Sequence, residues 1–98
     1  MNIKIQAIHF DASQPLHDFI TKKLNKLGKL AEAADSAEVT LKVVKPETAN
    51  NKATSIRIAL PGGEIFAEKV ADTFEEGVDN CIDALQKQLE RYKEKARG

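Results

Sequence analysis

The sequence predicts an α+β fold in two layers, with the element order β-α-β-β-β-α and both helices on one face of a four-stranded sheet. Four short segments alternate apolar and polar residues, which is the period of a β-strand. Two longer segments repeat apolar residues every three or four positions, which is the period of an amphipathic helix. Two one-sided helices must both bury their apolar stripes, and one sheet face is the available place.

The first strand and the first helix are predicted near the N-terminus. Residues 3–8 alternate as a strand does, and residues 16–30 carry the first helical stripe. Ser13 is the expected N-cap, and Pro15 suits the first turn, where its missing N–H costs nothing. Gly28 weakens the helix slightly. A helix between the first two strands predicts that these strands are parallel and linked by a right-handed crossover.

Three further strands are predicted at residues 39–44, 54–60 and 64–70. Residues 45–51 are polar and include a proline, so we expect a loop there. Pro-Gly-Gly at residues 61–63 predicts a tight hairpin turn. Because these connections are short, the later strands are expected to pair antiparallel.

The second helix is predicted from about residue 74 to about residue 95. Thr73 and Glu76 have the Thr-x-x-Glu spacing of a capping box. Cys81 and Tyr92 both belong to the apolar stripe, so we expect a core thiol and a core aromatic ring there.

Length and composition predict a single domain over residues 1–98. The single cysteine, Cys81, excludes an internal disulfide. No apolar run approaches the roughly 18 residues that a membrane span needs, and the alternating N-terminal segment does not have the pattern of a signal peptide. These features fit a cytosolic protein.

Basic residues gather on both helices although the chain, with 15 Lys+Arg and 15 Asp+Glu, is neutral overall. Neutrality argues against indiscriminate coating of nucleic acid, yet it allows a local basic patch. In the first helix no acidic residue lies between residues 21 and 31, and three lysines project within about 60° of one another. These are Lys22, Lys26 and Lys29, with Lys23 nearer the apolar stripe. The second helix has a row spaced by four: Lys87, Arg91 and Lys95.

Two interpretations of these rows stay open on charge alone. Lys and Arg near a helix C-terminus suit the helix dipole and need no further role. Alternatively, the two rows bracket a groove of positive potential, and Lys and Arg there bind the phosphates of RNA or DNA.

Other reactive side chains predict no chemistry. His9 and His17 have no partner at metal-ligand spacing, so no metal or other cofactor is expected. Asp79 and Asp83 share a helical face, but a general acid/base pair also needs a pocket. We therefore expect neither an enzyme nor a small-molecule substrate.

The whole chain resembles the short ribosome hibernation-promoting factors, also called ribosome-associated inhibitors or sigma-54 modulation proteins. The segments that carry the resemblance are, in order, NIKIQAIHFDAS, FITKKLNKLGKL, VTLKVVK, GGEIFA and VDNCIDALQKQLERYKEK. Their order and spacing together are specific, although no single segment is.

The resemblance implies a fold similar in topology to double-stranded-RNA-binding domains. It also implies binding to the small ribosomal subunit and the 70S ribosome, through 16S rRNA in the path of mRNA and of A- and P-site tRNA, with translation blocked in idle or stationary-phase cells. The rRNA-contacting positions of the family match Lys23, Lys26, Lys29, Lys87, Arg91 and Lys95; the helical wheel adds Lys22, and Lys93 is a weaker addition. Long-form relatives add a C-terminal dimerisation domain that we do not expect here, and we expect a monomer away from the ribosome.

One alternative is a protein-interaction regulator that binds through the open face or an edge strand of the sheet. It would be sensitive to changes at Lys42, Ser55 and Arg57 and tolerant of changes at the helix lysines. A small α+β enzyme is a weaker alternative, because the sequence has no nucleophile, base and pocket signature.

Overall fold

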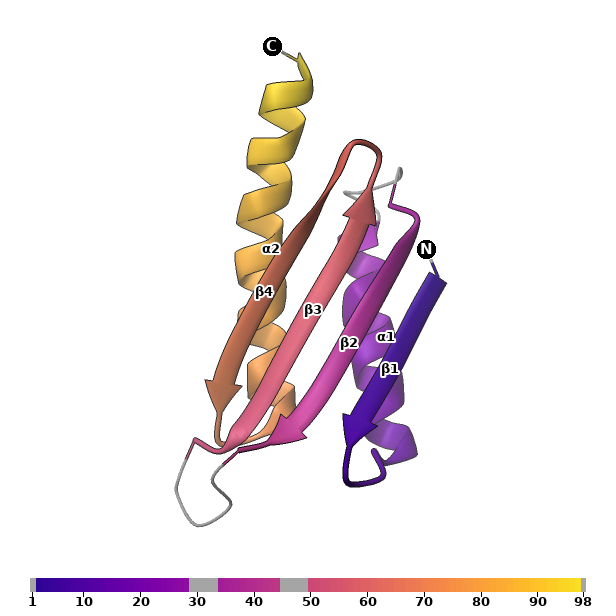
Figure 1. The fold of residues 1–98 in the computed structure, drawn as a ribbon, viewed down its shortest axis with the longest axis vertical. Helices are drawn as coiled ribbons and strands as arrows, with labels where there is room; N and C mark the ends of the chain where they lie inside the picture. The colour runs from indigo at the N-terminus through magenta and orange to yellow at the C-terminus, as the bar shows by residue number, and fades with distance from the viewer. Residues whose placement is uncertain (1, 29–33, 45–49, 98) are drawn as a thin grey trace.

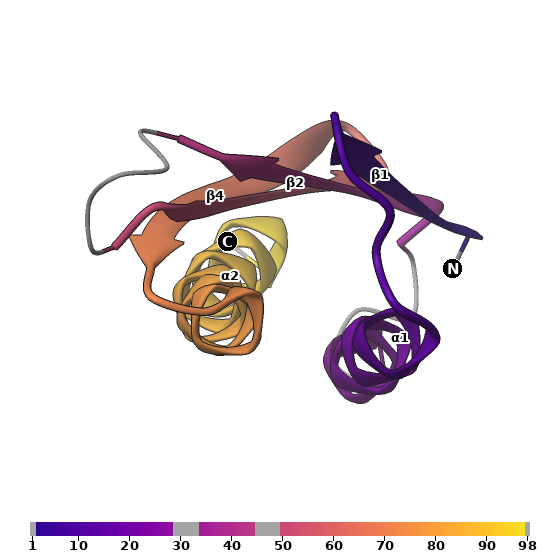
Figure 2. The same ribbon diagram turned by 90° about the horizontal axis from the view of Figure 1, so that it is seen from below.

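The computed structural model describes residues 2–28, 34–44 and 50–97, and they form one mixed sheet with two helices on one face (Figures 1 and 2). The elements are β1 (Asn2–Ile8), α1 (Gln14–Gly28), β2 (Ser36–Val43), β3 (Lys52–Leu60), β4 (Gly63–Ala71) and α2 (Phe74–Arg97). The predicted order and the α+β class are confirmed. None of the helices that the structure describes is both long and apolar enough to cross a membrane.

The strands lie in the order β1-β2-β3-β4, so each pairs with its neighbour in sequence. β1 and β2 are parallel, whereas β2, β3 and β4 are antiparallel, as predicted. The register brings Ile5, Val39 and Ile56 into one row across three strands. Such rows give the sheet one apolar face, and both helices pack on it (Figure 2).

The core lies between this sheet face and the two helices. α1 contributes a buried stripe of four leucine and isoleucine residues: Leu16, Ile20, Leu24 and Leu27. The matching stripe of α2 consists of Phe74, Val78, Cys81, Leu85 and Leu89. The ring of Phe74 also stacks on that of Phe10, with 5.2 Å between the centroids, so the segment after β1 is tied to the start of α2.

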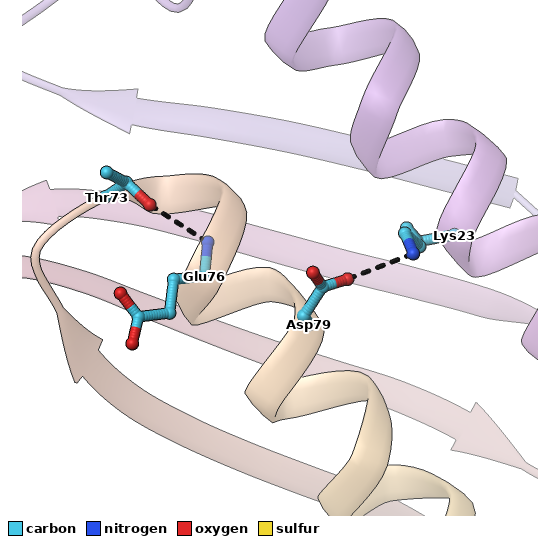
Figure 3. A network of polar contacts seen from close by, with 4 residues as sticks. All are labelled: Lys23, Thr73, Glu76 and Asp79. Carbon is cyan, nitrogen blue, oxygen red and sulfur yellow. Dashed lines mark hydrogen bonds and ion pairs between the residues drawn. The ribbon is translucent and has the colours of Figure 1, made fainter.

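Both helices begin at the predicted caps. The Ser13 hydroxyl accepts a hydrogen bond from the Leu16 N–H at 3.3 Å, and the Thr73 hydroxyl accepts one from the Glu76 N–H at 3.1 Å (Figure 3). Other boundaries of the helices and strands agree less well with the prediction. α1 ends at Gly28, and the expected continuation to residue 30 lies outside the described residues. β2 begins three residues before the predicted start at residue 39, because its first residues already pair with β1 and β3.

The hairpin between β3 and β4 is a two-residue turn that also anchors α2. Leu60 pairs with Gly63, and Gly62 has a φ of 80°, which only glycine adopts without strain. The Tyr92 hydroxyl donates a hydrogen bond to the carbonyl of Pro61. The predicted core role of Tyr92 is therefore partial: its ring packs against the core, and its polar end holds α2 to the turn.

A second set of hydrogen bonds joins α2 to the edge strand β4. The Phe66 N–H donates to Gln88 Oε1 at 3.1 Å, and Gln88 Nε2 donates to the Phe66 carbonyl at 2.7 Å. One side chain thus satisfies both backbone groups that β4 turns outward at Phe66. A new strand could pair with β4 at this point only by displacing Gln88.

Candidate nucleic-acid interface

The first-helix lysines differ in exposure. Lys22 and Lys26 are exposed and line a shallow hollow of about 400 Å³ on the outer surface of α1, together with Asn25. Both cations are therefore available to a ligand from solvent. Lys29 lies outside the described residues.

Lys23 is paired within the protein. Its ammonium lies 3.1 Å from a carboxylate oxygen of Asp79 on α2 (Figure 3). It also lies 5.4 Å from the centroid of the Phe19 ring. The absence of acidic residues between residues 21 and 31 therefore does not leave Lys23 unpaired, since its carboxylate partner comes from the other helix. An exposed pair of this kind is worth at most about 1 kcal/mol, so a phosphate can compete with Asp79 for Lys23.

The basic row of α2 lines a different hollow. Lys87 and Arg91 are exposed and share a cavity of about 490 Å³ with Lys69 of β4. Asp83 is the carboxylate beside them. The side chain of Lys95 lies outside the described residues.

Among the described residues, the exposed cations of the two rows line separate hollows, which differs from the single shared groove that the sequence suggested. The hollow that holds Lys87 and Arg91 is lined by α2 and β4 and by no residue of α1. Asp79 marks the side of α2 that faces α1, and Lys93 lies within about 40° of it at 100° per residue. Lys93, which is exposed, therefore lies toward α1, whereas Lys87 and Arg91 turn toward the sheet edge.

Lys69 is the basic residue that sequence reasoning missed. It does not stand in a helical row, so no charge pattern singled it out. The strand alternation carried the signal: β4 buries Ile65, Ala67 and Ala71 on its helix-covered face, and Lys69 has the same parity.

The open face of the sheet has a different character. Phe66 and Val70 are its exposed large apolar side chains, at 44% and 50% exposure. Arg57 lies 5.7 Å from the Phe66 ring centroid and forms an ion pair with Glu64 at 3.6 Å. Lys42 and Ser55 line a hollow of about 240 Å³ beside Val70. This face mixes charges of both signs with apolar surface and has no basic row.

Among the described residues, the one cysteine thiol is buried and no metal-ligand cluster is found. Cys81 is fully buried, as predicted, and burial raises the pKa of its thiol to about 11, so it stays protonated at neutral pH. Among the residues that the structure describes, no three His, Cys, Asp or Glu side chains gather closely enough to hold a metal ion.

Comparison with known proteins gives consistent matches along nearly the whole chain. A family model described as sigma 54 modulation protein / S30EA ribosomal protein matches residues 3–97. The ribosome hibernation promoting factor of Salmonella typhimurium is 30% identical over 95 residues, covering 97% of this chain and 96% of the relative. Its Pseudomonas putida counterpart is 27% identical, covering 97% of this chain and 89% of the relative. The structure of a ribosomal subunit interface protein from Coxiella burnetii superposes with a TM-score of 0.86 at 25% identity, over 95% of this chain and 98% of that one.

Proposed function

Because the chain belongs to the sigma 54 modulation protein / S30EA ribosomal protein family, we propose that it is a ribosome hibernation factor that binds the small subunit through 16S rRNA. In this proposal it occupies the path of mRNA and of A- and P-site tRNA and thereby blocks translation in idle or stationary-phase cells. It acts in the cytoplasm, where ribosomes translate, and it performs no chemistry.

The exposed cations of the helical layer are the observation that carries this proposal. Lys22 and Lys26 on α1 and Lys87 and Arg91 on α2 face solvent. Neither of the two ion pairs found among the described residues, Lys23–Asp79 and Arg57–Glu64, involves them. Free cations on a rigid surface bind phosphates by releasing counterions, without reading base sequence.

The mechanism is steric. The molecule is an elongated body of 47 × 23 × 18 Å, and the cations lie on two rigid helices fixed to one sheet. We propose that Lys22, Lys23, Lys26, Lys29, Lys87, Arg91, Lys93 and Lys95 contact rRNA phosphates and hold this body in the decoding channel. Since the two rows face different directions, they would contact separate rRNA segments rather than one strand in a shared groove.

Co-sedimentation with 30S subunits and 70S ribosomes tests the proposal. Replacing Lys26, Lys87 and Arg91 by Glu should abolish pelleting at moderate salt, whereas the wild-type protein should pellet and lose affinity steeply as salt rises. The matched control reverses three exposed charges on the open sheet face: Lys4 of β1, Lys42 of β2 and Arg57 of β3. Equal pelleting of the helix variant and the wild type, with both folded, would contradict rRNA binding through these helices.

The open sheet face supports a second candidate, a protein-interaction regulator. Phe66 and Val70 offer exposed apolar area there, and Arg57 lies beside them. The same pair of variants separates the candidates: loss of partner binding in the sheet-face variant alone would favour the regulator. Docking of a strand against β4 is disfavoured at Phe66, where Gln88 already occupies the edge.

A further inference from the structure

We propose that Lys69 of β4 completes, with Lys87 and Arg91 of α2, a three-cation pocket that holds one backbone phosphate of bound RNA. This inference rests on the proposed function, and it names a contact that the helical rows alone do not contain. The pocket is the hollow of about 490 Å³ between α2 and the sheet edge.

The position of Lys69 follows from the strand register. Ile65, Ala67 and Ala71 of β4 are buried under the helices, and Lys69 leaves the sheet on that same side. It is nevertheless exposed, because β4 is the edge strand and the side chain can extend past α2. It therefore enters the hollow from the sheet side while Lys87 and Arg91 enter it from the helix side.

The walls of the pocket are held in place. Gln88 lines the hollow, and its two hydrogen bonds to the Phe66 backbone fix α2 against β4. Lys87 and Arg91 are one helical turn apart, so their spacing to Lys69 is set by the rigid packing of the two elements. The fixed backbone spacing brings the three cations to one hollow, and each side chain becomes ordered only when an anion binds.

The charge of the pocket suits a phosphodiester. Three cations and one carboxylate line the hollow; the carboxylate is that of Asp83, one turn before Lys87 on α2, and Asn80 adds a neutral amide. Neither ion pair found among the described residues engages any of the three cations. An Arg guanidinium donates through two parallel N–H groups to phosphate oxygens, while the lysines act as point charges.

A competing explanation is that Lys69 protects the edge of the sheet. An inward-pointing charge on an edge strand discourages pairing with another chain, and Lys69 has that placement. Edge protection predicts that removing the charge promotes self-association and leaves RNA binding unchanged. Phosphate binding predicts that removing the charge weakens RNA binding and leaves self-association unchanged.

The direct test is an NMR titration of the full chain with hexauridylate RNA. The side-chain amide signals of Asn80 and Gln88, which line the pocket, should shift in a saturable way. Lys69→Gln should weaken this response about three- to tenfold and reduce the salt slope by about 0.7, the value for one phosphate contact on single-stranded RNA. Lys69→Arg should retain the wild-type response, and Lys42→Gln, the same change on the open sheet face, should leave it unaltered.

The outcomes separate the inference from the proposed function. If Lys69→Gln gives the same hexauridylate titration as the wild type, the three-cation pocket is overturned, whether or not the protein pellets with 30S subunits. Increased self-association of this variant would then assign Lys69 to edge protection. If the Asn80 and Gln88 signals shift with RNA but the protein does not pellet with ribosomes, the hibernation proposal is contradicted and the phosphate pocket is retained. Equal shifts with inorganic phosphate and with hexauridylate at equal phosphate concentration would identify a site for free anions and overturn RNA as the ligand.

Discussion

At the scale of single residues, the tightest constraint is the contact between Gly77 of α2 and Thr54 of β3. A Cβ built on Gly77 would lie 2.7 Å from Thr54 Oγ1 and 3.3 Å from Thr54 Cβ. Thr54 is fully buried, and its hydroxyl has no hydrogen-bond partner among the described atoms. A glycine in the interior of α2 is thus explained by close helix–sheet approach rather than by backbone flexibility.

This contact predicts that Gly77→Ala destabilises the protein although alanine is the better helix former. The gain in helix propensity is about 1 kcal/mol, whereas overpacking a filled core costs about 1–3 kcal/mol. The free energy of unfolding in urea should fall for Gly77→Ala and recover when Thr54→Ala is added. If Gly77→Ala changes the free energy of unfolding equally in the wild-type and the Thr54→Ala backgrounds, the two positions are not coupled.

At the scale of elements, the placement of α2 on the edge strand depends on Gln88. Its two hydrogen bonds to Phe66 replace the pairing that a further strand would provide. Gln88→Ala should lower the free energy of unfolding by about 1–2 kcal/mol and speed exchange of the Phe66 amide hydrogen. Gln86→Ala makes the same change on an exposed position of the same helix and serves as the control. Identical stabilities of the two variants would show that the two Gln88–Phe66 hydrogen bonds do not stabilise the fold.

The elements themselves could be predicted from local sequence, and their mutual rotation could not. Ser13 and Thr73 marked the helix starts because a capping hydroxyl acts within one turn. The pairing of Lys23 with Asp79, in contrast, depends on how α1 and α2 face each other. A helical wheel gives angles within one helix only, so it placed Lys87 and Arg91 correctly on α2 but could not show that they turn away from α1.

At the scale of the whole molecule, the chain is neutral, yet exposed cations gather on the helical layer, and Asp79 pairs with one further lysine of that layer. It lies between the helices and holds Lys23 at 3.1 Å. Because the pair is partly exposed, it contributes at most about 1 kcal/mol to stability. Its larger effect should be on rRNA binding, where it both occupies a lysine and repels phosphate.

Asp79→Asn should therefore tighten binding to 30S subunits by about three- to tenfold and steepen the salt dependence by about one phosphate contact. Glu38→Gln removes one negative charge from an exposed position on β2 and controls for net charge alone. Equilibrium pelleting across a salt series measures both quantities. If the two variants tighten binding equally, only the total charge of the molecule matters; a larger effect of Asp79→Asn places the seam between α1 and α2 against rRNA.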